Sequence, residues 1–553
     1  MELCAAANTA DTAQRKPNIL FIVADDLGWA DVGWHGSEFK TPHLDQLARA
    51  GVELDYHYVQ PVCTPTRTAL MSGRWTSRWG PHVLAPSNLR AFPPGTITLG
   101  GALQRAGYAT HLAGKWHLGS RPEWGPNHYG FDHSYGSLAG AVDPWAHTYR
   151  KGPYMQTWHR DEKLVDEKGN ATELVAKQVR EWIRAKREPW FIYVPFQAVH
   201  IPIDAPAEYK QLYANVNFPG NVGKTDAFHR YGGFVSQMDA KVGEFIAALE
   251  ETGQRRNTLI VFTSDNGGTP AIGNPYAGQT PPLMVPVSSN LPLRGHKAQL
   301  YEGGIRVPAF VNWPGTLAPR KLTAPLHAAD WMPTLTKLVG YTPATDLKWD
   351  GQDIWPLITG AVAKPAPRTI YIPMRNAAAV RHGDWKLISP NKGKKRELVN
   401  LAADPYEKKD LAAEELGKVK ELEQLLADPH EQTNLIARAE NAEHVERLMK
   451  LMKQWQMKVG DTLDLPAENK TPETVDLTGR KRVPDQWQPE WIVKKYFEAT
   501  QQDSEARAEK GQRAKQWIWN QKESLETNFY CPTHRPAAGS VGRDQRQPLT
   551  RMA

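Results

Sequence analysis

Two pairs of side chains in the sequence are of the kind that hold a hard metal ion. Asp25 and Asp26 directly follow one short apolar run, and Asp265 and Asn266 follow another. Carboxylate and amide oxygens are the ligands that calcium and magnesium prefer. Either pair alone is typical of a turn at the end of a strand. A third apolar run leads to His200, and if the three runs are neighbouring parallel strands, these side chains meet at one site.

The sharpest motif in the chain is Cys63-Thr-Pro65-Thr-Arg67. We expect it in a loop, ahead of a helix that starts near Thr68. An isolated cysteine is most often an inert buried side chain, so the surrounding Cys-x-Pro-x-Arg pattern carries the information. A second stretch, residues 107–117, ends in Gly-Lys-Trp-His.

These two stretches resemble the two signatures of the type I sulfatases in the alkaline phosphatase superfamily, whose cysteine is oxidised after translation to formylglycine. The resemblance extends from Pro17 to about Pro356, includes residues 293–297 and 301–306, and is strongest to enzymes like arylsulfatase B, the N-acetylgalactosamine-4-sulfatase. Thr68 stands where alanine or serine is more usual. The resemblance implies a sulfuric ester hydrolase and a formylglycine-generating maturase that acts on Cys63.

The resemblance also implies a metal site. A divalent ion would offset the negative oxygens of a sulfate ester. Calcium is the first choice and magnesium the second, because three carboxylates and one amide oxygen make a roomy oxygen cage. The implied ligands are Asp25, Asp26, Asp265, Asn266 and a hydroxyl of the hydrated formylglycine at Cys63.

Three basic side chains have implied roles at the same site. Lys115 and Lys297 would neutralise the remaining sulfate oxygens as point charges. Arg67 would brace the formylglycine and its loop rather than touch sulfate.

The implied mechanism uses both hydroxyls of the hydrated formylglycine. One attacks sulfur, and its proton is drawn toward Asp265. His200, helped by Lys297, protonates the departing alcohol oxygen, because imidazole titrates near neutral pH. His117 then takes the proton of the second hydroxyl, sulfate leaves and the aldehyde re-forms. This covalent route divides one difficult displacement into two easier ones.

Two other functions stay open from the sequence. The same formylglycine and metal would serve a phosphonate monoester or phosphodiester hydrolase. A non-catalytic protein that binds sulfated glycans is the other alternative, against which the intact Cys63, Asp265, His117 and His200 count.

The leaving group is indicated less directly, and we expect a sulfated galactose or galactosamine in a polysaccharide. Residues 136–150 stand where the arylsulfatase B-like enzymes place a substrate-facing loop. An aromatic side chain there would stack on a sugar face, and polar ones would bind hydroxyls or a second anionic group; a loop packed inward is the alternative. The candidate substrate residues are Asp143, Trp145, His147, Arg150 and, outside the loop, Arg294.

The elements that must position these residues form an alternating series. The apolar runs predict strands buried on both faces of a parallel sheet, and amphipathic patterns between them predict helices. Strands that alternate with helices indicate a doubly wound α/β sheet, which agrees with the alkaline-phosphatase-like fold that the resemblance implies. The predicted strands are 18–24, 190–196 and 258–263, and the predicted helices are 98–106, 172–186 and 231–251.

The predicted catalytic domain, 17–365, ends at a proline-rich stretch. Four short alternating segments then predict a small antiparallel sheet followed by a helix, in an α+β domain spanning 366–460. Within it, Asp404-Pro-Tyr-Glu recurs as Asp428-Pro-His-Glu, which we interpret as two helix-capping turns, a duplicated insertion being the alternative. Residues 461–553 are expected to be an arm, disordered toward its end. The four segments are 370–373, 377–381, 385–388 and 397–401.

The bulk properties exclude few functions. Lysine and arginine exceed aspartate and glutamate by 67 to 60, which suits an anionic substrate but is also ordinary surface chemistry. Cys4, Cys63 and Cys531 make no disulfide framework. We expect no nucleic-acid partner, and no apolar run approaches the length of a membrane span. Residues 1–16 are interpreted as the stub of a trimmed signal peptide, which predicts a periplasmic or secreted protein; an ordinary cytoplasmic leader is the alternative.

Overall fold

The structure, a computed structural model, describes residues 16–427 apart from 186, 188, 217–224, 270–286 and 391–395, together with residue 450. The chain divides into two compact units, Met1–Leu435 and Ile436–Ala553, and every described residue except 450 belongs to the first. Cys4, Cys531 and the predicted arm 461–553 therefore lie outside the described residues, as do residues 1–15. No helix among the described residues is both long and apolar enough to cross a bilayer.

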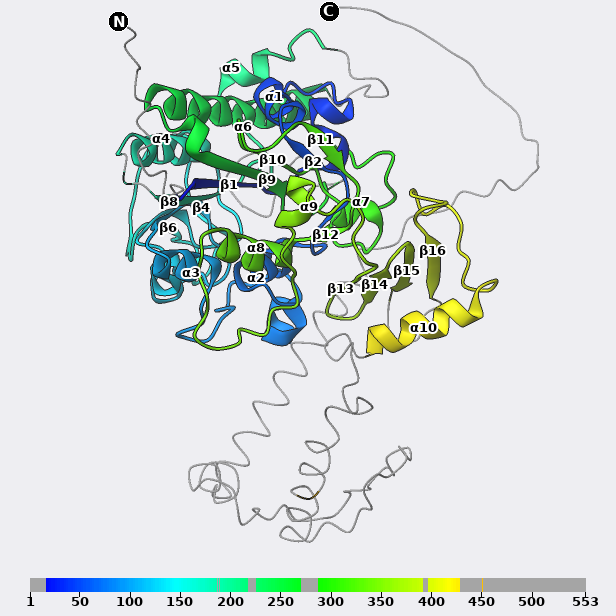
Figure 1. Ribbon diagram of the computed structural model, residues 1–553. Helices are drawn as coiled ribbons and strands as arrows, with labels where there is room; N and C mark the ends of the chain where they lie inside the picture. The colour runs from blue at the N-terminus through cyan, green and yellow to red at the C-terminus, as the bar shows by residue number, and fades with distance from the viewer. Residues whose placement is uncertain are drawn as a thin grey trace, which may run out of the picture. The chain divides into compact units, whose positions relative to one another are not determined.

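A ten-stranded mixed sheet forms the centre of the first unit (Figure 1). β1 (Asn18–Ala24) lies between β8 (Trp190–Pro195) and β9 (Thr258–Ser264) and pairs with both in parallel. All seven residues of β1 are buried, as expected for a strand covered on both faces. The sheet order is β11-β2-β10-β9-β1-β8-β4-β5-β6-β7, in which the other strands are β2 (Val52–Leu54), β4 (Ala109–Lys115), β5 (His133–Ser137), β6 (Trp158–Arg160), β7 (Lys163–Leu164), β10 (Phe310–Asn312) and β11 (Arg320–Leu322).

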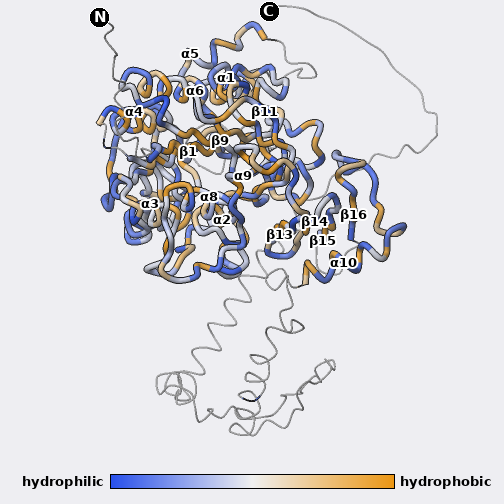
Figure 2. The backbone as a smooth tube through the Cα atoms, viewed as in Figure 1, coloured by the Kyte–Doolittle hydropathy of each residue, from blue (hydrophilic) through white to orange (hydrophobic). Residues whose placement is uncertain are grey.

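Helices cover both faces of this sheet (Figure 1). Leu20 and Ile22 of β1 belong to one hydrophobic core, whereas Phe21 and Val23 belong to the other, which is the period of two expected of a strand. The first core includes residues of α1 (Pro42–Arg49), α4 (Ala171–Arg184) and α6 (Thr225–Glu251), and the second includes residues of α2 (Cys63–Ser72), α3 (Leu99–Arg105) and α8 (Trp331–Leu338). Hydrophobic colour is concentrated on β1 and β9 in Figure 2.

The remaining helices and strands around the ten-stranded sheet are short. They are α5 (Ala207–Gln211), α7 (Glu302–Ile305), α9 (Trp355–Thr359), a two-stranded ladder of β3 (His57–Tyr58) with β12 (Leu326–His327), and 3₁₀ turns at Trp29–Asp31, Gly33–His35, Thr76–Trp79, Pro81–Val83, Pro122–Trp124, Pro126–Tyr129, Arg255–Asn257 and Ala328–Asp330.

The predicted doubly wound sheet is confirmed, with the predicted strands and helices shifted by a few residues at most of their ends. Side-chain caps set two of the helix starts. The Thr98 hydroxyl accepts from the backbone N–H of Gly101 at 3.3 Å, and the Asn170 side chain accepts from Thr172 at 3.0 Å. Such caps satisfy N–H groups that the first turn of a helix leaves without partners.

The predicted small antiparallel sheet is also confirmed. Its order is β13-β14-β15-β16, and α10 packs on it through a core of Val380, Leu387, Leu398 and Leu422. Residues 428–449 and 451–460 of the predicted domain lie outside the described residues. The elements are β13 (Thr369–Pro373), β14 (Ala378–His382), β15 (Trp385–Ser389), β16 (Glu397–Asn400) and α10 (Leu416–Ala427).

The first copy of the Asp-Pro repeat caps no helix, contrary to our interpretation. Its residues form a turn in which the Glu407 N–H donates to the Asp404 carbonyl, and the next helix begins only at Leu416. Glu407 instead turns inward with a left-handed φ of 55° and is buried. A buried ion pair explains that conformation better than a cap. The second copy, at Asp428, begins outside the described residues.

That ion pair belongs to a buried cluster that joins the small sheet to the rest of the unit. Lys386 of β15 donates to Glu302 of α7 and to Glu407, both at 2.8 Å, and all three side chains are at most 1% exposed. The Tyr58 hydroxyl donates to the second Glu302 oxygen at 2.8 Å. Burial opposes ionisation, but Lys386 holds the pKa of Glu302 below its ordinary value, so the pair is charged.

Lys386→Met should destabilise the protein by about 3–5 kcal/mol, because it leaves two buried carboxylates without their cation. Lys409→Met is the matched control. Lys409 pairs with Glu414 in solvent, both side chains being more than half exposed, so its loss should cost less than about 1 kcal/mol. Urea unfolding midpoints measure both effects, and equal shifts for the two variants would refute a structural role for the buried cluster.

Candidate active site

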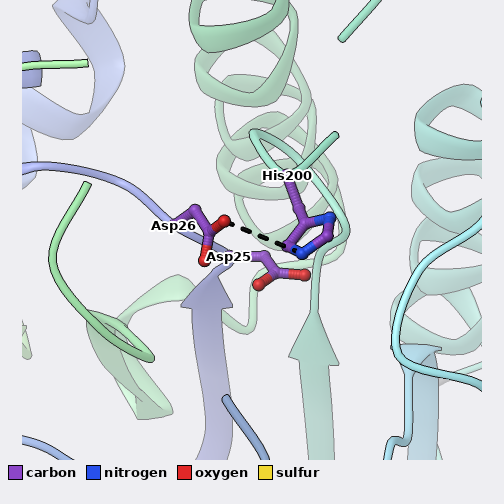
Figure 3. Close-up of side chains that lie close together, drawn as sticks. All are labelled: Asp25, Asp26 and His200. Atoms are coloured by element: carbon purple, nitrogen blue, oxygen red, sulfur yellow. Dashed lines mark ion pairs between the residues drawn. The ribbon is translucent and has the colours of Figure 1, made fainter. Parts of the chain in front are cut away.

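The predicted metal-binding and catalytic side chains come together at the carboxyl ends of adjacent parallel strands. Asp25 and Asp26 follow β1, Asp265 follows β9, and Lys115 is the last residue of β4. His200 stands in the loop after β8, and its imidazole faces the Asp26 carboxylate in Figure 3. Because β9, β1, β8 and β4 are neighbours in the sheet, residues far apart in sequence meet at one edge.

We predicted a loop around Cys63, and this was wrong: Cys63 is the first residue of helix α2. Pro65 stands in the first turn, where backbone N–H groups need no partner within the helix. The Thr66 hydroxyl donates to the Asp265 carbonyl at 2.6 Å, which ties this first turn to the end of β9. The Cys63 side chain is 2% exposed, and burial raises the pKa of its thiol.

Arg67 occupies the buried space between α2 and the strand ends. Its Nε and Nη2 donate to one oxygen of Asp265 at 3.0 and 2.7 Å, and Nη1 donates to the Lys115 carbonyl at 2.9 Å. Burial would lower the pKa of Arg67, but the Asp265 carboxylate raises it above its ordinary value, so the guanidinium is charged. The guanidinium thus ties α2, which begins at Cys63, to the ends of β9 and β4.

Two lysines neutralise the other two carboxylates. Lys115 donates to Asp25 at 2.6 Å, and neither side chain is exposed. Lys297 donates to both oxygens of Asp26, at 2.5 and 2.7 Å. Burial and, after it, the neighbouring Asp265 raise the pKa of Asp25 to about 8, despite Lys115.

The free oxygens of the site fit a cation. Asp25 Oδ1 and Asn266 Oδ1 are buried and have no hydrogen-bond partner. A buried oxygen without a partner is costly, and a metal ion would satisfy both. Asp25, Asp26 and His200 each offer an atom, and these atoms lie within 4.8 Å of one another. The residues therefore fit a divalent ion bound through oxygen.

The two candidate acid–base histidines line the same cavity but contact different groups. His117 has a left-handed φ of 56°, and its Nε2 lies 3.3 Å from the Thr64 hydroxyl. Gly140 admits the imidazole, since a Cβ there would lie 2.3 Å from Nε2. His200 places Nε2 3.7 Å from Asp26 while Nδ1 contacts the Ile201 carbonyl at 2.6 Å. Burial lowers the pKa of both, that of His200 to about 3.

A cavity of about 360 Å³ opens above these groups. Its wall includes Cys63, His117, His200, Lys297 and Asp26, so the predicted nucleophile, acid–base and charge-neutralising residues face one space. Asp25, Asp265, Lys115 and Arg67 are buried and do not line it. The other lining residues are Pro86, Ser87, Asn88, Gly140, Ala141, Tyr149, Arg150, Ile201 and Thr269.

Known proteins decide the family. The Sulfatase family profile matches residues 17–341. Mouse arylsulfatase J is 33% identical over 470 residues, which cover 74% of each chain. Rat N-acetylgalactosamine-6-sulfatase is 32% identical over 379 residues, 64% of this chain and 68% of the relative. The crystal structure of Ps i-CgsB in complex with k-i-k-neocarrahexaose matches with a TM-score of 0.67 and 29% identity, over 80% of this chain and 99% of that one.

The chain belongs to the sulfatase family. It is a sulfuric ester hydrolase, as the sequence predicted. The cavity of this sulfatase is also bounded by residues that the sequence gave no reason to select, among them Ser87 and Asn88. They stand in a segment without helical or strand periodicity, where only the fold brings them to the site.

The five candidate substrate residues of the sulfatase differ in whether they reach the cavity, are exposed elsewhere or are buried. Arg150 lines the cavity. Trp145 is 43% exposed, and its indole N–H donates to Asp204 at 2.9 Å. Asp143 and His147 are buried. The Asp143 carboxylate accepts from the backbone of its own loop, and the His147 ring stacks on Trp158.

Arg294, the fifth candidate, contacts the small sheet. It donates to Glu397 at 2.9 Å and to the Glu407 carbonyl at 3.1 Å. Its guanidinium also lies 3.8 Å from the ring centroid of Tyr301. Arg150 is thus the one candidate of the five that lines the cavity above Cys63.

Calcium should raise the melting temperature of the metal-stripped sulfatase, because an ion bound only by the folded state stabilises it, by about 2.7 kcal/mol at a hundredfold excess over its Kd. Asp25→Asn should lose this shift. The matched control is Asp346→Asn, which alters an exposed carboxylate and should keep it. Thermal unfolding with calcium or magnesium measures the effect. An unchanged calcium shift in Asp25→Asn would contradict the site, and a larger shift with magnesium would reverse the order of the metals.

Proposed function

We propose that this sulfatase removes sulfate from a sulfated saccharide of the galactose or galactosamine type, using a formylglycine made from Cys63 by a maturase and a divalent ion, calcium before magnesium. The observation that carries the proposal is the shared cavity: Cys63, His117, His200 and Lys297 line it, above three buried carboxylates. The buried Asp25 and Asn266 oxygens, which have no hydrogen-bond partner, support the presence of the ion.

The saccharide part of the proposal is supported by the relatives. One is named N-acetylgalactosamine-6-sulfatase, and another was solved in complex with k-i-k-neocarrahexaose. The cavity of this chain adds polar and aromatic groups suited to a sugar, including Asn88, Tyr149 and Arg150.

The residues that would hold the ion are Asp25, Asp26, Asp265 and Asn266. When bound, a divalent ion offsets negative charge on the sulfate oxygens and on the carboxylates. Lys115 keeps Asp25 in place, and Arg67 does the same for Asp265. Formylglycine, once hydrated, supplies a hydroxyl nucleophile and a second hydroxyl through which the aldehyde can re-form.

The other side chains divide the proton transfers between them. His200 and Lys297 both face Asp26, at 3.7 and 2.5 Å, and both line the cavity. Burial opposes the charge of Lys297, but Asp26 raises its pKa above the ordinary value, so Lys297 carries a proton that His200 would relay to the departing alcohol oxygen. His117 instead contacts Thr64 in the first turn of α2. Burial keeps His117 neutral, so it can accept the proton that release of sulfate requires.

Cys63 should carry the modification. Protein produced with a maturase should contain a peptide about 18 Da lighter than the cysteine form, since the thiol is replaced by an aldehyde oxygen. Cys63→Ala should keep the fold and lose turnover of an aryl sulfate. Peptide mass spectrometry and initial rates measure the two effects. Full activity of Cys63→Ala would overturn the proposal, and faster turnover of an aryl phosphonate than of the aryl sulfate would favour a phosphonate hydrolase. Unmodified Cys63 from the native host would favour a non-catalytic glycan-binding protein.

The two histidines should respond differently to the leaving group. His200→Ala should slow hydrolysis of a saccharide sulfate by about 10²–10⁴-fold and of an activated aryl sulfate much less, because a phenol of low pKa hardly needs protonation. His117→Ala should slow both substrates by similar factors, because sulfate release does not involve the alcohol. The comparison needs kcat for both substrates and both variants. Equal losses on the two substrates for His200→Ala would remove its role as the leaving-group acid.

A further inference from the structure

A second cavity of about 570 Å³ adjoins the active-site cavity. Pro86 lines both cavities, and it is exposed. Two consecutive residues also connect the cavities: Lys297 lines the first and Ala298 lines the second. Val62, next to Cys63, belongs to the second cavity. A molecule that extends out of the active site over Pro86 therefore meets this second space.

Both sheets contribute to the walls of the second cavity. The large-sheet body supplies residues 84–86 and 298–301, and the small sheet supplies 374–377. Residues 374–377 close the hairpin between β13 and β14 through a hydrogen bond from the Met374 N–H to the Ala377 carbonyl at 2.7 Å. The hydroxyl of Tyr301, a residue of the cavity wall, donates to Glu397 of β16 at 2.6 Å and so ties the two sheets together. The walls are therefore held in place before any ligand binds.

The lining combines apolar surface with a cation. Leu84, Leu300, Met374 and Ile388 offer apolar contacts, and Arg375 and Asn376 are exposed at the hairpin tip. Among the described residues, no ion pair holds the Arg375 guanidinium. A sugar ring presents apolar C–H faces and polar edges, and a guanidinium binds carboxylate or sulfate oxygens through paired N–H donors. An anionic sugar therefore fits this lining.

We propose that the second cavity is a subsite for the sugar residue next to the one that loses its sulfate, and that Arg375 binds an anionic group on that neighbour. This inference rests on the proposed saccharide sulfatase function and deepens it. The anionic group is a sulfate in a sulfated galactan and a uronate carboxylate in a glycosaminoglycan. The subsite makes an oligosaccharide a better substrate than a sulfated monosaccharide, because the second sugar adds binding energy that the first alone lacks.

Arg375→Ala tests the proposal on the complete, metal-loaded protein. The substrates are an aryl sulfate, sulfated galactan tetrasaccharides and chondroitin sulfate tetrasaccharides, the last two separating the two sources of charge. The ratio of kcat/KM for the tetrasaccharide to that for the aryl sulfate should fall by about 10–100-fold on the galactan, the chondroitin sulfate or both, as expected for a lost charge-assisted hydrogen bond. Arg49→Ala, which alters an exposed arginine of α1, is the matched control and should keep both ratios.

A binding measurement makes the result independent of turnover. Calorimetric titration of the same tetrasaccharides into Cys63→Ala protein should show a Kd that rises by a similar factor when Arg375→Ala is added. Unchanged ratios and unchanged Kd for both saccharides would overturn the subsite. A wild-type protein that hydrolyses no sulfate ester would instead defeat the proposed function, while the titrations would still decide whether the second cavity binds an anionic saccharide.

Discussion

The structure depends on keeping three carboxylates, Asp25, Asp26 and Asp265, almost wholly buried at the ends of two adjacent strands. Like charges so placed repel one another in a medium that screens them poorly. The protein meets this cost with one cation for each acid: Lys115 on Asp25, Lys297 on Asp26 and Arg67 on Asp265. These cations arrive from β4, from the loop before α7 and from α2. The requirement for charge balance thus determines which elements must converge at this edge of the sheet.

Helix α2 shows how that requirement also places the reactive residue. Arg67 is one turn along from Cys63, so fixing the guanidinium against Asp265 fixes the first turn of the helix as well. The Thr66 hydroxyl adds a second tie to the same strand end. Cys63 is therefore positioned by buried contacts of its own helix and needs no direct contact with the carboxylates. The surrounding cavity can then vary without disturbing it.

Much of this arrangement could be predicted from the sequence, because buried strands such as 18–24 and 258–263 are continuous apolar runs whose ends must meet in a parallel sheet. The helical start at Cys63 could not, since the Cys-x-Pro-x-Arg motif is too short to show a helical period and its first turn is held by contacts to the distant Asp265. Asp143 and His147 are polar residues of a loop, and nothing in their spacing shows that they face inward. Ser87 and Asn88 lack any periodic signal. The inward or outward direction of loop side chains is decided by tertiary packing, which leaves no local pattern.

The buried lysine of β15 couples the small sheet of this sulfatase to the active-site end of the large sheet. Lys386 holds Glu302, which begins α7, and the Gly304 carbonyl of that helix accepts from the Gly267 N–H, one residue after Asn266. A small sheet taken from another protein would need a cation at the position of Lys386. Without it, Glu302 would be left buried and unpaired, and α7 could shift at its contact with Gly267, beside Asn266. The hairpin tip at Arg375 and Asn376 is exposed and has no comparable buried charge to balance. The tip should therefore accept changes of sequence, whereas the base of the small sheet can be exchanged only together with its buried contacts.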